Sequence, residues 1–214
     1  MAHGSRLTMI AIIDCEIGNL RSVQKAFEFI GVEAKVTSDP GAILSARAVV
    51  LPGVGAFRDA MAFLTETGLD GVIKQVVGAG TPFFGICLGM QMFADVSEEG
   101  GEMKGLSLMP GRVVKLPNSV KVPEMGWNTA EAKAETAVLK DIPADARFYF
   151  AHSYYFAPAQ NSDVAAVTDY GVEFASVVAR DNVFGTQFHP EKSGQHGLQI
   201  LRNFASLAKQ RDSG

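Results

Sequence analysis

The sequence has few cysteines, no long hydrophobic run and no excess of positive charge. Two cysteines among 214 residues cannot form a disulfide framework, so we expect a reducing compartment, by default the cytoplasm. No hydrophobic run approaches the length of a membrane span, and the N-terminus lacks the basic-then-hydrophobic pattern of a signal peptide. A formal net charge of −4 provides no basic surface for nucleic acid. We therefore expect neither a nucleic acid nor a membrane as the main partner.

The remaining composition is that of a globular chain, with 47% hydrophobic residues. No linker, repeat or low-complexity tract divides it, and its length suits one large domain. We expect a single domain over residues 9–210. Residues 1–8 look like an N-terminal extension outside the fold, either a cloning remnant or the result of a start codon placed too far upstream.

Strand and helix patterns alternate in the first part of the chain. Residues 9–14 (MIAIID) are a continuous hydrophobic run that ends in an acid, which is typical of a parallel strand buried on both faces. Hydrophobic side chains recur at helical spacing over residues 18–30, and further strands are expected at residues 34–37 and 48–51. This order predicts βαβ units, and so an α/β fold with a mostly parallel twisted sheet and helices on both faces.

The later segments add detail to this fold. A turn is expected at residues 38–41, and a helical pattern over residues 56–77 should break near Gly68. Short strands separated by proline and glycine over residues 105–168 predict antiparallel strands added to the sheet. Residues 194–209 predict an amphipathic helix without chemistry of its own.

Residues 81–91 (TPFFGICLGMQ) have the pattern of a reactive cysteine at a strand-to-helix turn. A strand pattern ends at Gly85 and a short helix pattern follows Cys87, so that close glycines allow a tight turn that exposes the sulfur. The helix N-terminus would favour the thiolate, and Gln91, one turn further, would face the same ligand. The alternative for this motif alone is a small buried core cysteine.

A second segment, about a hundred residues downstream, contains a base and a carboxylate. Residues 184–191 (FGTQFHPE) predict a strand with a polar end, and Pro190 favours an extended His189, which would place His189 and Glu191 on one side. An imidazole can take the thiol proton while the acid fixes its tautomer. Taken alone, His189 is better explained as a surface or satisfied core residue. Together with Cys87 it predicts nucleophilic catalysis.

The loop PGVG (residues 52–55) follows an expected strand and carries two glycines. A tetrahedral oxyanion needs hydrogen-bond donors, which this loop and the peptide N–H of Leu88 could supply. A simple chain turn is the alternative. In open α/β sheets, ligands bind beyond the carboxyl ends of the strands, where this loop and Cys87 are both expected.

These motifs resemble those of the class I, triad-type, glutamine amidotransferases. The similarity is carried by GICLGMQ (residues 85–91) and QFHPE (residues 187–191). Within that superfamily the resemblance is to the glutaminase subunits of imidazole glycerol phosphate synthase, an enzyme of histidine biosynthesis. The narrowing rests on GNLRSV (18–23), PGVGAF (52–57), VP (122–123), MGWN (125–128) and AHSY (151–154). The resemblance covers about residues 9–209.

This resemblance implies a glutamine amidotransferase-like, flavodoxin-like fold and a defined reaction. The implied enzyme hydrolyses L-glutamine to glutamate and ammonia with the triad Cys87, His189 and Glu191. It passes the ammonia to a (βα)8-barrel cyclase subunit, with which it forms a heterodimer. The cyclase makes imidazole glycerol phosphate and aminoimidazole carboxamide ribotide. No metal and no organic cofactor are implied.

The resemblance also implies roles for residues outside the triad. The implied oxyanion-hole residues, which act through their backbone, are Gly53, Val54 and Leu88. The implied glutamine-binding residues are Gln91, Ser153 and Tyr154. The implied residues of the partner interface and its gating are Asn19, Arg21, Met125 and Trp127. Without the resemblance, the glycine-flanked turn around Trp127 predicts core or half-buried packing.

Three positions depart from the family pattern and leave alternatives open. Glu124 stands where histidine is common, Glu16 where glycine is frequent, and Cys15 where tyrosine is usual. One alternative is the glutaminase subunit of a paralogous amidotransferase acting on surface polysaccharide. Another is a non-catalytic, thiol-bearing α/β binding protein, which would not need the His189–Glu191 pair. The acidic loop of residues 97–102 is interpreted as a solvated surface loop.

Overall fold

The computed structural model describes residues 10–15 and 19–210. The proposed extension at residues 1–8 and the departure at Glu16 lie outside these ranges. None of the helices in the described part is long and hydrophobic enough to cross a membrane.

Fourteen strands and nine helical segments make up the described fold. The strands are β1 (Ile10–Ile13), β2 (Ala34–Thr37), β3 (Ala48–Gly53), β4 (Phe83–Cys87), β5 (Val96–Ser97), β6 (Met103–Lys104), β7 (Gly111–Lys115), β8 (Glu124–Thr129), β9 (Glu131–Ala132), β10 (Arg147–His152), β11 (Tyr154–Pro158), β12 (Val164–Asp169), β13 (Glu173–Arg180) and β14 (Val183–Thr186). The α-helices are α1 (Leu20–Phe29), α2 (Pro40–Ser45), α3 (Phe57–Glu66), α4 (Leu69–Gly78), α5 (Leu88–Gln91) and α6 (Gly194–Gln210). The 3₁₀ segments are η1 (Ala137–Leu139), η2 (Asn161–Asp163) and η3 (Pro190–Lys192).

The central sheet has the strand order β2-β1-β3-β4-β14-β13-β12-β9. The first five strands pair in parallel, and β13, β12 and β9 continue the sheet antiparallel. This arrangement confirms the mostly parallel sheet with added antiparallel strands. Because β14 comes from the end of the chain and pairs with β4, the sheet joins distant parts of the sequence. The prediction of a single domain over residues 9–210 agrees with this pairing and stays a prediction.

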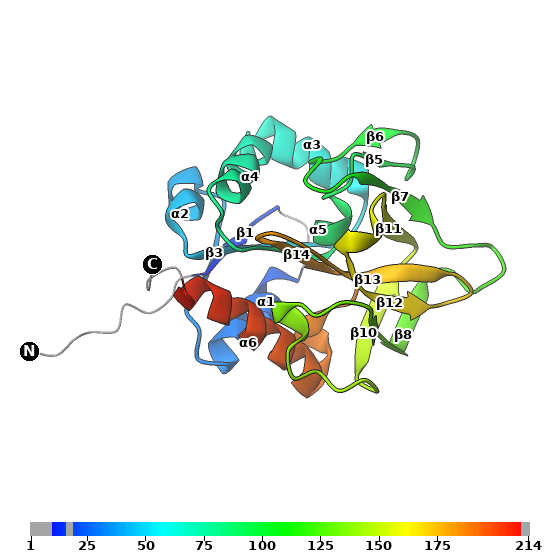
Figure 1. Cartoon of the computed structure of the whole chain (residues 1–214). Helices are drawn as coiled ribbons and strands as arrows, with labels where there is room; N and C mark the ends of the chain where they lie inside the picture. The colour runs from blue at the N-terminus through cyan, green and yellow to red at the C-terminus, as the bar shows by residue number, and fades with distance from the viewer. Residues whose placement is uncertain (1–9, 16–18, 211–214) are drawn as a thin grey trace, which may run out of the picture.

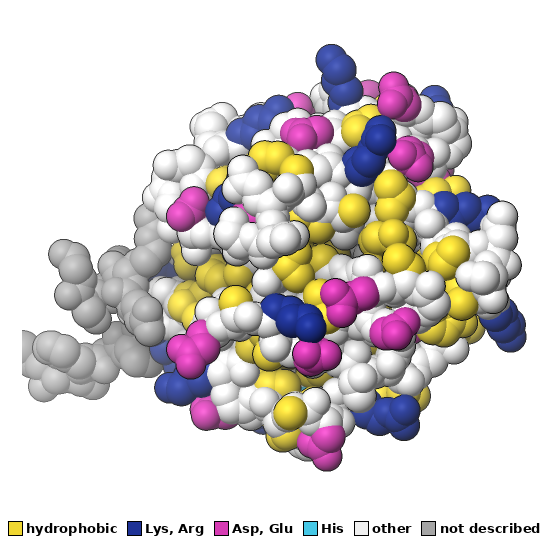
Figure 2. Space-filling view, turned by 45° about the vertical axis from the view of Figure 1, so that its right-hand side comes forward, with side chains coloured by type: hydrophobic (Ala, Val, Ile, Leu, Met, Phe, Trp, Pro, Cys, Tyr) yellow, Lys and Arg dark blue, Asp and Glu magenta, His cyan; other side chains and the backbone are white. Residues whose placement is uncertain are grey.

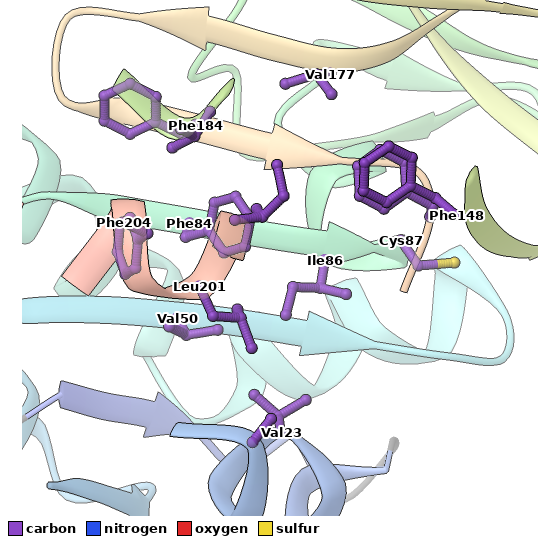
Figure 3. Close-up of a cluster of buried hydrophobic side chains, with 14 of the residues drawn as sticks. Val23, Val50, Phe84, Ile86, Cys87, Phe148, Val177, Phe184, Leu201 and Phe204 are labelled. Carbon is purple, nitrogen blue, oxygen red and sulfur yellow. The ribbon is translucent and has the colours of Figure 1, made fainter. Parts of the chain in front are cut away.

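Helices cover both faces of the parallel part, as Figure 1 shows, with α2, α3 and α4 on one side and α1 and α6 on the other. Alternate residues of β1 point to opposite faces, so Ile10 and Ile12 join one buried cluster while Ala11 and Ile13 join the other. A strand buried on both faces reads as a continuous hydrophobic run, which explains the pattern of residues 9–14. Figure 3 shows part of the cluster beneath α6.

Most expected elements are present, but two expected turns are wrong. Pro40 begins helix α2, and the carboxylate of Asp39 caps it by accepting the N–H of Ala42 at 2.9 Å. The segment around Trp127 is strand β8, because six residues pair antiparallel with β10. The break near Gly68 is confirmed, since Gly68 has φ of 72° and separates α3 from α4.

The carboxyl ends of β3, β4 and β14 meet at one edge of the sheet. Gly53 is in register with Cys87, and Thr186 is in register with Ile86. The two-stranded ribbon β8–β10 and the four-stranded sheet β11-β7-β5-β6 lie on this side (Figure 1). Figure 2 shows hydrophobic side chains gathered across the middle of one face, with acidic and basic side chains interspersed around them. Because the carboxyl ends of β3, β4 and β14 meet here, the expected site residues converge at the edge where an open α/β sheet binds its ligands.

Candidate active site

Cys87 is the last residue of β4 and is held in a strained conformation. Its φ of 55° and ψ of −111° are unusual for a residue with a side chain. In Figure 3 its sulfur lies at the margin of the hydrophobic cluster and points away from it. This geometry is that of a nucleophile elbow, in which strain at a strand-to-helix turn presents the nucleophile.

The glycines near Cys87 serve packing rather than the turn itself. Neither Gly85 nor Gly89 has a positive φ. A Cβ on Gly89 would overlap the carbonyl oxygen of Leu51, and one on Gly85 would overlap Phe93 and the backbone of α5. A Cβ on Gly185 of β14 would press on Met90. The glycines therefore let α5 lie directly on the sheet, while Cys87 alone takes the strained conformation.

His189 and Glu191 form a buried pair. The imidazole Nδ1 lies 2.9 Å from Glu191 Oε1, and the two side chains are 3% and 2% exposed. His189 has the extended backbone that Pro190 favours, with φ of −98° and ψ of 97°. Its N–H donates to the carbonyl of Tyr149, and its carbonyl accepts from the Ser193 hydroxyl at 2.6 Å. The backbone of the base is thus fixed on both sides.

The environment of His189 favours its protonated form. Burial lowers the pKa of the imidazole, but its hydrogen bonds to Cys87 and Glu191 and the attraction of both groups raise that pKa to about 10. Because Glu191 faces Nδ1, the remaining ring nitrogen is the one available to the sulfur. Glu191 Oε2 is buried and has no hydrogen-bond partner within the described residues. The predicted triad residues are therefore brought together.

A hydrogen-bond chain links Cys87 to Gln91 through a residue that the sequence reasoning passed over. The amide of Gln187 donates to the Cys87 sulfur at 3.6 Å, and its oxygen accepts from Gln91 Nε2 at 3.2 Å. Gln91 Nε2 also donates to the carbonyl of Tyr154 at 2.7 Å. Gln187 is fully buried and precedes His189 by two residues. Its position inside the motif QFHPE was the available signal.

Cys87 opens into a cavity of about 220 Å³. The described residues that line it are Val54, Gly55, Cys87, Leu88, Gln91, Glu99, Pro123, Met125, Ala151, His152, Ser153 and Tyr154. Gly53 lies beside Cys87 in the sheet but does not line the cavity. A larger hollow of about 730 Å³ is lined by residues 132–137, 139 and 140 and contains none of the predicted site residues. The small cavity is the one that joins the predicted nucleophile to the predicted ligand-binding residues.

The acidic loop of residues 97–102 is more than a solvated surface loop. Glu99 accepts the N–H of Phe57 at the start of α3 at 3.0 Å, and Arg58 donates to the carbonyl of Gly100 at 2.9 Å. Glu99 is also the only carboxylate among the described residues that line the cavity. The sequence pattern of acids and glycines gave no sign of this, because the contact spans 42 positions.

The four residues expected at a partner interface are all exposed. Asn19 and Arg21 lie at the start of α1, while Met125 and Trp127 on β8 are 67% and 51% exposed. Trp127 packs edge-on against Tyr149, and Lys192 lies over that ring. Segment η3, which contains Lys192, contacts both β10 and α1. These contacts form a continuous path from β8 to α1 along the edge of the sheet.

Cys15 and Cys87 are both free, and they belong to different environments. Cys15 packs in the cluster under α2 to α4, whereas Cys87 packs in the cluster on the other face. Burial, followed by the negative charge of Asp14, raises the pKa of the Cys15 thiol to about 12. Cys15 is therefore an inert thiol. No group of three or more potential metal-binding side chains occurs in the described ranges.

Comparison with known proteins places the chain in a family. The family model for class-I glutamine amidotransferases matches residues 11–207. The chain belongs to the class-I glutamine amidotransferase family. It is 50% identical over 200 residues to the imidazole glycerol phosphate synthase subunit HisH of Moorella thermoacetica, covering 94% of this chain and 95% of that protein. It is 49% identical over 201 residues to HisH of Caldanaerobacter subterraneus, covering 94% and 99%.

Solved structures of this amidotransferase fold agree. The chain matches the structure of PurLQS from Thermotoga maritima with a TM-score of 0.76 at 18% identity, covering 94% of this chain and 98% of that one. It matches the glutaminase domain of Trypanosoma brucei CTPS, solved with bound acivicin, with a TM-score of 0.64 at 16% identity, covering 93% and 94%. These matches confirm the class I amidotransferase-like α/β fold expected from the sequence.

Proposed function

We propose that this amidotransferase is the glutaminase subunit of an imidazole glycerol phosphate synthase and supplies ammonia for histidine biosynthesis. The observation that carries the proposal is the Cys87–His189–Glu191 arrangement at a small cavity. The roughly 50% identity to proteins named HisH, over nearly the whole chain, supports the choice of acceptor enzyme. The relatives reported above carry that name, so no observation favours the surface-polysaccharide alternative.

In the first half of the reaction the Cys87 sulfur attacks the side-chain carboxamide of glutamine. A C–S bond forms, and the negative charge moves to the carboxamide oxygen, where the peptide N–H groups of the Gly53–Val54 loop and Leu88 would stabilise it. The C–N bond then breaks as the His189 imidazolium donates its proton to the leaving ammonia. Because His189 holds a proton to high pH, it is ready to act as the acid in this step.

In the second half, water hydrolyses the glutamyl thioester. His189, now neutral, takes a proton from water while the oxygen attacks the thioester carbon. The C–S bond breaks, glutamate leaves, and the sulfur recovers its interaction with the imidazolium. Glu191 holds Nδ1 throughout, so that the other ring nitrogen stays directed at the reacting atoms.

The cavity contains groups suited to the rest of the glutamine molecule. Glu99 offers a carboxylate to the α-ammonium group, and Ser153 offers a hydroxyl and backbone groups to the α-carboxylate. Gln91 donates its N–H groups to Tyr154 and Gln187, so its own oxygen is left to accept from the substrate. These assignments add Glu99 to the residues expected from the sequence.

The proposal predicts that Cys87→Ala abolishes glutamine-dependent synthesis by the complex with the barrel cyclase. Ammonia-dependent synthesis should continue, because the variant removes only the ammonia source. The measurement is glutamate release together with imidazole glycerol phosphate formation, from glutamine and then from ammonium salt. Cys15→Ala is the matched control and should keep both activities, since that thiol is inert and faces the other side of the sheet.

Glutamine-dependent synthesis by Cys87→Ala would refute the assignment of the nucleophile. Glutamate release by the wild-type chain that does not respond to the cyclase and its ribonucleotide would keep the triad chemistry but overturn the proposed acceptor.

A further inference from the structure

Glu124 and His152 form a second buried histidine–carboxylate pair beside the cavity. They face each other in the β8–β10 ribbon, with His152 Nε2 3.0 Å from Glu124 Oε2 and side-chain exposures of 1% and 4%. Asn128 Nδ2 donates to the other carboxylate oxygen of Glu124 at 3.0 Å. The catalytic steps proposed above do not use this pair.

The hydrogen bonds of His152 define which of its ring nitrogens donates to the backbone. Nδ1 lies 2.9 Å from the carbonyl oxygen of Tyr154, which can only accept. Nε2 faces a carboxylate that already accepts from Asn128. Nδ1 therefore carries a proton and donates it to the Tyr154 carbonyl, while Nε2 shares a hydrogen bond with Glu124.

The Tyr154 carbonyl connects this pair to the glutamine site. The same oxygen accepts from His152 Nδ1 and from Gln91 Nε2, at 2.9 Å and 2.7 Å. A carbonyl oxygen has two lone pairs, so these two donors use both of them. Holding this carbonyl in place sets the amide plane of Gln91 and therefore the direction of its free oxygen in the cavity.

We propose that the Glu124–His152 pair is a positioning device for glutamine: Glu124 orients His152, His152 fixes the Tyr154 carbonyl, and that carbonyl aligns Gln91 toward the substrate. The inference rests on the proposed glutaminase function. Because Glu124 begins β8, the pair also joins the exposed strand of Met125 and Trp127 to the glutamine cavity.

Two substitutions of Glu124 separate positioning from a merely structural role. Glu124→Met keeps the length of the side chain but leaves Nε2 without a partner. We expect the KM for glutamine to rise about tenfold, the effect of one misplaced hydrogen bond, with kcat changed by less than about twofold. Glu124→Gln can donate its amide to Nε2 of a neutral ring, so Nδ1 keeps its proton and KM should stay close to the wild-type value. Glu173→Gln, an exposed acid on β13, is the charge-matched control.

The ring protons of His152 supply a readout that needs no variant. Nitrogen chemical shifts should show Nδ1 protonated both in the wild-type chain and in Glu124→Gln. A wild-type Nδ1 without a proton would overturn the proposal even if Glu124→Met failed to fold. An unchanged KM in a folded Glu124→Met, or equal KM values in the Met and Gln variants, would also overturn it.

The two proposals fail in distinguishable ways. Absence of glutamate release by the wild-type chain with its partner would remove the proposed function. Normal release by the wild type, with no KM difference among the Glu124 variants, would remove only the positioning role.

Discussion

Cys87, His189 and Glu191 show how local conformation and burial act together on single residues. The strained backbone of Cys87 presents the sulfur, and the imidazolium beside it is stabilised by its interactions with Cys87 and Glu191 despite its burial. The sequence interpretation assigned the activation of the thiol to a helix N-terminus. Helix α5 has only four residues, which makes its dipole small. The cation at His189 is therefore the main electrostatic partner of the sulfur.

The raised pKa of His189 predicts a pH-dependent contribution to stability. The folded chain binds this proton more tightly than the unfolded chain, whose histidine has the ordinary pKa of 6.5. The stabilisation is therefore complete below pH 6.5 and is lost as the pH rises toward about 10. We expect the free energy of unfolding of the wild type, minus that of His189→Gln, to decrease over this range in urea titrations. A difference that stays constant from neutral to alkaline pH would contradict this.

Helix α5 depends on glycines for its place on the sheet. Gly89 lies where any Cβ would overlap the carbonyl of Leu51, so α5 and β3 can approach only if this residue is glycine. The same close approach brings Leu88 beside Gly53 and Cys87. The packing of α5 on β3 and the shape of the candidate oxyanion site therefore both depend on glycine at position 89.

Gly89→Ala should lower the free energy of unfolding by about 1–3 kcal/mol or more, the usual cost of overpacking a rigid contact. Urea denaturation of the full chain measures it. Gly71→Ala in α4 is the matched control, because its Cβ would meet nothing within 4 Å. That variant should be stabilised by about 0.5–1 kcal/mol, since alanine is favoured over glycine within helices. Equal effects at the two positions would argue against close packing of α5.

The whole molecule presents its cavity and its exposed aromatic strand on the same edge of the sheet. Met125 lines the cavity and is also exposed, so the outer face of β8 and the cavity are separated by one strand. The path through Tyr149 and Lys192 extends this face to α1. We expect a partner bound there to cover the side of the cavity that Met125 lines.

Trp127→Ala should weaken the complex with the cyclase by roughly tenfold or more, as expected for an exposed aromatic anchor at an interface. Calorimetric titration of the cyclase with each variant measures this. Phe29→Ala is the control, because Phe29 is 72% exposed at the far end of α1, away from the edge that carries the site. A Trp127→Ala complex as tight as the wild type would place the interface elsewhere.

The sequence by itself determined the parallel core and the family, and it predicted the triad, because each depends on local patterns. Continuous hydrophobic runs identify strands buried on both faces, and the motifs around Cys87 and His189 each lie within a short segment. Only the tertiary structure revealed the contacts of Glu99, Gln187 and the Glu124–His152 pair. Their contacts join segments 28 to 100 positions apart. Such contacts depend on strand order and register, which bring distant side chains together and leave no periodic trace in the chain.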